Sequence, residues 1–181
     1  MQHYILFSGH RLDKPGRTPT RFPASKAIAA TVAIRKTLEA ILTRVPAPTI
    51  KAIAAAADGG DILFYEACKD LGIPSEIYLA IPIPEFLKTS VTAEWQDRYY
   101  QLTHTLPVHI LHPDVTADAP NTIWEEVNSW MLDKALSAGG ARLTLIALWD
   151  GSPGETGGTA HMIRVAKNHN AAIEIIDTHM L

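Results

Sequence analysis

A continuous apolar run followed by a glycine-rich segment is the feature that most constrains how this chain folds. The run covers residues 143–149, Leu-Thr-Leu-Ile-Ala-Leu-Trp, which is typical of a strand buried on both faces of a parallel sheet. The segment after it contains Asp150, Gly151, Gly154, Gly157 and Gly158. We expect Thr159 to cap a helix whose apolar stripe is formed by Met162, Ile163 and Ala166.

The rest of the chain alternates between expected strands and expected helices. We expect strands at residues 4–8, 49–57, 76–82, 108–111, 143–149 and 172–176. We expect helices at residues 25–45, 62–71, 95–106 and 122–137 and from residue 159 onward, with a loop or short helix at 83–94. This order predicts an α/β fold, a Rossmann-like three-layer sandwich with a mostly parallel sheet of about five or six strands. No linker interrupts it, so residues 1–181 are expected to form a single domain.

Two of these helices carry detailed expectations about their ends and faces. Ser25 can cap the first helix, whose expected apolar face consists of Ile28, Val32, Leu38, Ile41 and Leu42. The pattern Thr122-x-x-Glu125 has the form of a capping box at the start of residues 122–137.

Composition excludes several classes of protein. The chain of 181 residues is 47% hydrophobic and 19% charged, which suits a folded domain with a real core. Residues 1–51 hold nine Lys or Arg against two Asp or Glu, but the whole chain has a net charge of −3. A generally acidic protein with one basic segment suits a small anionic ligand better than long nucleic acid. Cys68 is the single cysteine, no apolar run is long enough to span a membrane, and we expect a cytoplasmic protein without cofactor or metal.

Three loops with chemically active residues follow expected strands. They cover residues 8–22, 58–61 and 150–159. Ligands of parallel α/β sheets bind outside the carboxyl ends of the strands, where these loops would meet. Glycine allows the backbone to approach an anion, and the N–H groups at a helix start attract negative charge. The three loops together therefore predict a site for a small anionic ligand.

The first two loops supply most of the candidate ligand-binding residues. Ser8, Gly9 and His10 stand at the end of the first strand, and Arg17 and Arg21 can pair with phosphate through their guanidinium groups. Gly59 and Gly60 can expose N–H groups to an anion. Asp61 would repel phosphate, but it can accept hydrogen bonds from ribose hydroxyls or cap its own helix. From the third loop the candidates are Asp150, Gly151, Gly157, Gly158 and Thr159.

No residue has a firm catalytic assignment. Glu66 and Asp61 are the candidates for a general acid or base, although Glu66 on a helix is more often an exposed surface residue. Trp95 and Arg98 fall on one helical face, where they either pack or stack on a base. The chain has neither a Walker loop nor a Gly-x-Gly-x-x-Gly motif after its first strand.

In their order along the chain, three motifs resemble the SLOG superfamily of Rossmann-like domains, named for the DNA-processing protein A and Lonely-guy families. The motifs are Ser8-Gly9-His10 with Arg-Phe-Pro at 21–23, the stretch 57–67 around Gly-Gly-Asp, and Trp-Asp-Gly through Gly-Gly-Thr-Ala at 149–160. The resemblance implies binding of nucleotides or nucleotide-derived ligands, often as a sensor in bacterial defence or signalling. It also implies that Gly59, Gly60, Gly157, Gly158 and Thr159 line the ligand site.

Lonely-guy enzymes hydrolyse nucleoside monophosphates and carry the pattern Pro-Gly-Gly-x-Gly-Thr-x-x-Glu. In this chain Met162 and Ile163 stand in the region where that pattern has its glutamate. This departure argues against the hydrolase activity.

The sequence leaves three hypotheses for function. The first is a bacterial module that binds or senses a nucleotide-derived ligand and signals through an effector protein or a homo-oligomer. The second is an enzyme that cleaves an N-glycosidic or phosphate bond. The third is a scaffold whose loops bind no ligand.

Overall fold

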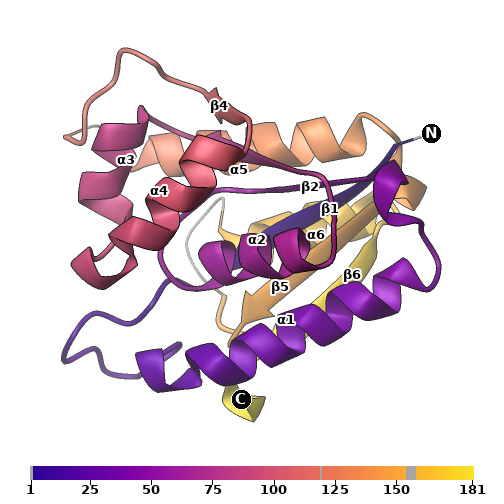
Figure 1. Cartoon of the computed structure of the whole chain (residues 1–181), viewed down its shortest axis with the longest axis horizontal. Helices are drawn as coiled ribbons and strands as arrows, with labels where there is room; N and C mark the ends of the chain where they lie inside the picture. Colours follow the sequence, from indigo (N-terminus) through magenta and orange to yellow (C-terminus); the bar gives the residue numbers. More distant parts are fainter. Residues whose placement is uncertain (1, 119, 154–157) are drawn as a thin grey trace.

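The computed structural model describes residues 2–118, 120–153 and 158–181. They form a three-layer α/β sandwich around one six-stranded, all-parallel sheet with strand order β4-β3-β2-β1-β5-β6 (Figure 1). This confirms the fold that the alternation of strands and helices predicts.

The elements follow the expected order closely. The strands are β1 (His3–Gly9), β2 (Ile50–Ala54), β3 (Ser75–Leu79), β4 (Val108–Ile110), β5 (Leu143–Trp149) and β6 (Ala172–Asp177). The helices are α1 (Ala27–Leu42), α2 (Gly60–Asp70), α3 (Ile83–Ser90), α4 (Gln96–Thr105), α5 (Thr122–Leu136) and α6 (Thr159–Asn168). Short 3-10 helices cover Ala24–Lys26, Ala47–Thr49, Ala93–Trp95, Gly140–Arg142 and Thr178–Met180. Among the described helices, none combines the length and the hydropathy that crossing a bilayer requires.

Two apolar cores lie on opposite faces of the sheet. Alternate residues of β5 point to the two cores: Leu145 joins the core beneath α5 and α6, whereas Ile146 joins the core beneath α1 and α2. The central strand β1 does the same with Leu6 and Ile5. Because both faces are covered, β5 needs apolar residues at nearly every position, which explains the run at 143–149.

The expected apolar face of α1 is wrong at two positions. Its buried stripe is formed by Ala30, Ile34, Leu38 and Ile41. Ile28 and Val32 are instead 81% and 63% exposed. Each lies two residues before a member of the stripe, which places it about 200° around the helix axis.

Three expected N-caps are also wrong. Ser25 lies inside the 3-10 helix that precedes α1, and the N-cap position of α1 is taken by Lys26. Asn121 is the N-cap of α5, so Thr122 is already helical and forms no capping box. Gly158 is the N-cap of α6, and Thr159 is its first helical residue. In α6 this difference bears on function, because it leaves the Thr159 hydroxyl available for another partner.

Candidate functional site

The three candidate loops meet where the order of strands reverses. From β1 the chain continues outward through β2, β3 and β4, and it then returns to place β5 and β6 on the other side of β1. The connections that leave the paired carboxyl ends of β1 and β5 therefore lead to helices on opposite faces of the sheet, which makes this point a topological switch point, the usual ligand position in such sheets.

A cavity of about 140 Å³, here named the edge cavity, lies at this point. The described residues that line it are Phe7, Ser8, Gly9, Ala55, Asp61, Asn128, Met131, Gly158 and Thr159. Five of them come from the candidate set of the sequence, and between them they represent all three loops. The structure thus brings Ser8, Gly9, Asp61, Gly158 and Thr159 together around one space.

The two hydroxyl groups in the edge cavity contact each other beside the start of α6. Ser8 Oγ lies 2.8 Å from Thr159 Oγ1, so the pair links the end of β1 to the first turn of α6. No described side chain caps this helix, and its first turn has no acidic residue. The N–H groups at the start of α6 and its positive dipole end are therefore suited to an anion.

Asp61 is the one acidic group among the described residues of the edge cavity. It is 8% exposed and lies in the first turn of α2, and its carboxylate accepts a hydrogen bond from the Ala57 N–H at 3.1 Å. Burial raises the pKa of Asp61 from 3.8 to about 7, although the Ala57 N–H and the Arg11 guanidinium act in the opposite direction. Gly59 holds the N-cap position, so Asp61 does not cap α2. Because its pKa is about 7, Asp61 is partly protonated and partly ionised at neutral pH.

Gly59 and Gly60 serve the packing of the loops and are not among the described residues that line the edge cavity. Gly59 has a φ of +93°, and a Cβ there would lie 2.9 Å from the backbone nitrogen of Leu12. Gly60 rests against the Phe7 ring and donates its N–H to the His10 carbonyl at 3.2 Å. Both glycines let the loop before α2 approach the loop after β1 closely.

Arg11 ties the same loops together through charge. Its Nε donates to Asp58 Oδ1 at 3.0 Å and its Nη1 to the Thr89 carbonyl at 3.1 Å. Asp58, which is 1% exposed, also accepts the Thr92 N–H at 2.8 Å. Neither Arg11 nor Asp58 is singled out by the sequence as a site residue. The available signal was their position, since Arg11 directly follows Ser8-Gly9-His10 and Asp58 directly precedes Gly59-Gly60-Asp61.

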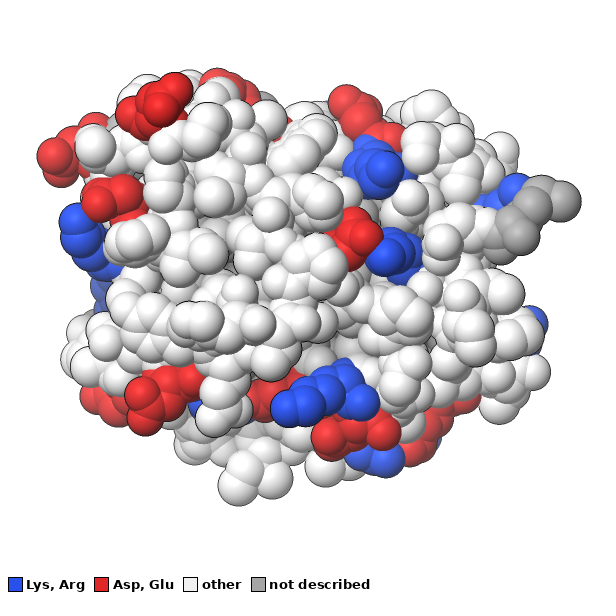
Figure 2. Space-filling model, turned by 45° about the horizontal axis from the view of Figure 1, so that its top comes forward, with Lys and Arg blue, Asp and Glu red and all other residues white. Residues whose placement is uncertain are grey.

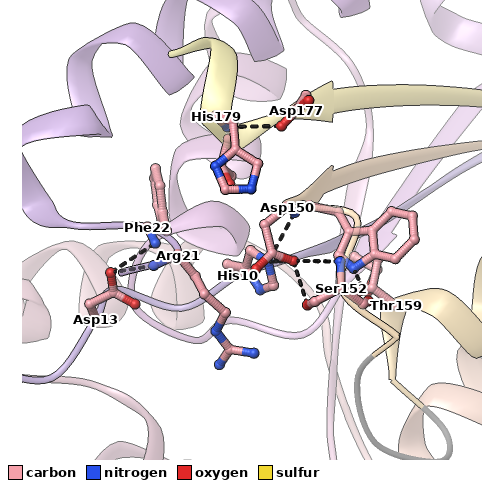
Figure 3. Close-up of polar contacts among 12 residues, drawn as sticks. His10, Asp13, Arg21, Phe22, Asp150, Ser152, Thr159, Asp177 and His179 are labelled. Carbon is pink, nitrogen blue, oxygen red and sulfur yellow. Dashed lines mark hydrogen bonds and ion pairs between the residues drawn. The ribbon is translucent and has the colours of Figure 1, made fainter. Parts of the chain in front are cut away.

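His10 and Asp150 contact each other and fix the ends of β1 and β5 (Figure 3). Asp150 Oδ1 lies 3.0 Å from His10 Nε2 and accepts both the hydroxyl and the N–H of Ser152. Burial lowers the pKa of His10, although Asp150 acts to raise it. Burial acts to raise the pKa of Asp150, but the hydrogen bonds from Ser152 and the neighbouring His10 outweigh it and hold the pKa below its usual range. This network holds Asp150 and Ser152 in place just beyond the end of β5.

The arginines of the first loop lie outside the described lining of the edge cavity. Arg17 pairs with Asp13 at 3.4 Å. Arg21 donates its backbone N–H to the same carboxylate, and its side chain extends away from Asp13 (Figure 3). Its Nε is buried and has no hydrogen-bond partner among the described residues.

Several other candidates are placed elsewhere. Glu66 accepts two hydrogen bonds from Arg98, at 2.7 and 2.5 Å, and Arg98 stacks on the Trp95 ring at 3.8 Å. Gly151 is exposed beyond the end of β5, and Gly157 lies outside the described residues. Within the described part of the chain, no group of three or more His, Cys, Asp or Glu side chains could hold a metal ion.

A larger cavity of about 440 Å³, here named the aromatic chamber, adjoins the edge cavity. Its described lining consists of Arg11, Ala55, Ala57, Phe86, Thr89, Ser90, Ala117, Asn121, Trp124, Val127 and Asn128. Ala55 and Asn128 line both spaces.

No protein-family model, curated protein or solved structure matches this chain.

The distribution of charge on the surface adds one observation about partners. On the face shown in Figure 2, the charged side chains form small groups in which basic and acidic residues are mixed. Wide areas without Lys, Arg, Asp or Glu separate these groups. That face offers no continuous basic stripe of the kind that binds long nucleic acid.

Proposed function

We propose that this protein binds a nucleotide or nucleotide-derived ligand, with the anionic group of the ligand in the edge cavity. The observation that carries the proposal is the convergence of Ser8, Gly9, Asp61, Gly158 and Thr159 on one cavity at the start of α6. A helix start that no described side chain caps attracts an anion, and two hydroxyls beside it can donate hydrogen bonds.

Asp61 determines which form of the site accepts an anion. When ionised, its carboxylate repels a phosphate in the same small cavity. When protonated, it becomes a hydrogen-bond donor to that phosphate. With its pKa raised to about 7, protonation near neutral pH needs little free energy. Anion binding at a pH well above 7 should therefore be accompanied by uptake of one proton at Asp61.

We favour a sensor over an enzyme, in line with the resemblance to the SLOG superfamily. Met162 and Ile163, in the region where Lonely-guy enzymes have their glutamate, are buried in the core beneath α6. Glu66 is engaged by Arg98. A sensor of this kind would act in the bacterial cytoplasm and signal through an effector protein or a homo-oligomer.

Asp61 supports one alternative, a hydrolase that uses this carboxyl group as its general acid or base. A buried carboxyl group with a pKa of about 7 in a cavity suits proton transfer at neutral pH. Of the described residues around the edge cavity, Asp61 is the one with a carboxyl group.

Thermal unfolding with AMP, ADP, cyclic AMP, NAD, ADP-ribose and ribose 5-phosphate tests the proposal. A ligand at about a hundred times its Kd adds about 2.7 kcal/mol, which raises the Tm of a chain this long by about 5–10 °C. Thr159→Val should remove most of that shift. Thr31→Val is the matched control, because Thr31 donates within α1 to the Ala27 carbonyl, and it should keep the shift.

Analysis of the protein–ligand mixtures for breakdown products then distinguishes the sensor from the hydrolase. A Tm shift with intact ligand supports the sensor, whereas a released base or ribose phosphate supports the hydrolase. If none of the six compounds shifts the Tm, the nucleotide proposal is wrong and the scaffold hypothesis remains.

A further inference from the structure

The strand β6 leaves one edge of the sheet open. It is the last strand in the order β4-β3-β2-β1-β5-β6, and in Figure 1 it lies at the margin of the sheet beside α1. All six of its residues pair with β5 on one side. On the other side, the backbone of β6 forms no hydrogen bond with any part of the chain that the structure describes. Such a row of free N–H and C=O groups can pair with a further strand.

The opposite edge of the sheet is protected against pairing, whereas β6 is not. The strand β4 has three residues and directly follows Pro107, which has no N–H group to donate. The strand β6 is twice as long and contains neither proline nor lysine, the residues that commonly block pairing at an edge. Its register with β5 is unbroken, so no bulge twists the edge away.

The side chains of β6 add an exposed apolar contact at the middle of this edge. Ile173 packs against the core beneath α5 and α6, and Ile176 belongs to the core on the other face of the sheet. Ile175 points to the same face as Ile173, because the two are separated by two positions in a strand. It is nevertheless 50% exposed. The fold thus leaves a large apolar side chain uncovered on a strand that can still pair.

A second copy of this chain fits the open edge by two-fold symmetry. A two-fold axis pairs the β6 strands of two copies antiparallel and closes the assembly, whereas pairing of β6 with β4 of another copy would leave an open-ended array. The charges at the two ends of the strand agree with antiparallel order. Asp177 ends the strand and is exposed, and the exposed Lys167 and His169 precede it. Each acidic end would therefore lie beside the basic end of the partner.

The residues of β6 select one register for this pairing. If the two-fold axis passed beside Glu174, the two Glu174 carboxylates would stand directly opposite each other, which is unfavourable. An axis beside Ile175 pairs residues 173–177 of both strands and sets the two exposed isoleucines side by side. An axis closer to either end of the strand would pair fewer residues.

We propose that this protein forms a two-fold symmetric dimer in which the β6 strands of two copies pair antiparallel about Ile175. The pairing joins the two sheets into one and satisfies the free N–H and C=O groups of both edges. It also removes the Ile175 side chains from water. The described lining of the edge cavity contains no residue of β6, so the dimer does not depend on a ligand there.

Analytical ultracentrifugation of the full chain tests the dimer. The wild type should sediment with twice the 19.8 kDa mass of one chain. Ile175→Lys places two like charges beside the two-fold axis and should raise the Kd of the dimer about tenfold or more. Ile28→Lys is the matched control, because Ile28 is more exposed than Ile175 but lies on α1. It should leave the Kd unchanged.

An engineered disulfide tests the register. In the proposed pairing, the Cα atoms at position 175 of the two copies lie about 4.5–5.5 Å apart, a separation that a disulfide spans. Ile175→Cys should therefore form a covalent dimer that a thiol reductant separates. Ala172→Cys, also exposed on β6, is the control, because its two copies would lie about 20 Å apart. The natural Cys68 is buried and should not react.

Each outcome supports or overturns the β6 dimer. If the wild type remains a monomer at the highest concentration reached, the proposal is wrong. It is also wrong if Ile175→Lys and Ile28→Lys affect the Kd equally, since the interface would then lie elsewhere. Should Ile175→Lys fail to fold, the cross-linking still decides. A dimer that Ala172→Cys cross-links and Ile175→Cys does not would rule out the pairing about Ile175.

Discussion

Replacing Asp61 with asparagine should stabilise this protein at alkaline pH. The carboxyl group has a pKa of 3.8 in an unfolded chain and of about 7 in the fold, because it is buried at the edge cavity. At a pH above 7 the group is ionised in the folded state as well, and a pKa shift of this size then lowers the free energy of unfolding by about 4 kcal/mol. The asparagine oxygen can still accept the Ala57 N–H, although that bond weakens by about 1 kcal/mol without the charge. The net gain expected from Asp61→Asn is thus about 3 kcal/mol above pH 7.

The pH dependence has a definite sign. Below pH 3.8 the group is protonated in both states and costs nothing. As the pH rises from 3.8 to about 7, the unfolded chain releases its proton first, so the free energy of unfolding of the wild type falls. The gap between Asp61→Asn and the wild type should therefore widen by about 3 kcal/mol between pH 4.5 and 8.5. Groups common to both proteins cancel in this comparison.

Urea unfolding at pH 4.5 and 8.5 measures the gap directly, and a Tm difference of about 6–12 °C should accompany it at pH 8.5. Asp58→Asn is the control, since Asp58 is also buried but is paired with Arg11 and the Thr92 N–H. It should destabilise the protein at both pH values. A constant gap between Asp61→Asn and the wild type at the two pH values would refute the reasoning, because the carboxyl would then titrate as in the unfolded chain.

Three further outcomes follow from the same residues. Affinity for the bound nucleotide, measured by titration between pH 7.5 and 9 where the phosphate is already a dianion, should fall about tenfold per pH unit in the wild type and stay level in Asp61→Asn. Gly59→Ala should cost more than about 2 kcal/mol in urea unfolding, because its Cβ meets backbone, whereas Gly139→Ala, with a similar positive φ but open space, should cost about 1 kcal/mol. Arg11→Met should lower the free energy of unfolding by about 3 kcal/mol, because it leaves the Asp58 carboxylate without its cationic partner. The double variant Arg11→Met with Asp58→Asn should recover part of that loss. Equal stability of the single and double variants would contradict the pairing.

The sequence predicts the central strands well because their burial on both faces is evident from their own residues. The run at 143–149 requires apolar groups on both faces, and residues 4–8 show the same property. The face of α1 was harder to predict because its buried stripe begins with Ala30, a small residue, while the larger Ile28 and Val32 lie in solvent. Hydrophobicity alone ranks Ile28 and Val32 above Ala30. Only the packing of the helix against the rest of the fold shows which of its sides is covered.

The candidate site was predictable at the level of loops but not of contacts. Parallel strands bring their carboxyl ends to one edge, so the grouping of Ser8, Asp61 and Thr159 follows from topology. The pairing of Arg11 with Asp58 depends on how the backbone of the first loop passes Gly59, which no local pattern specifies. Burial of Asp61 likewise depends on α5, which is distant in the sequence and covers the cavity through Asn128 and Met131.

The wrong prediction at Thr159 explains how the start of α6 remains suited to a ligand. A threonine at the N-cap would direct its own hydroxyl to the first N–H groups of the helix. Here glycine takes that position, and the Thr159 hydroxyl is directed to Ser8 on the neighbouring strand. The contact joins β1 to α6 without using the N–H groups that an anion needs. Local sequence rules place a threonine cap here because they optimise the helix alone. A glycine at the N-cap costs only a few tenths of a kcal/mol relative to threonine, and this arrangement retains an anion site.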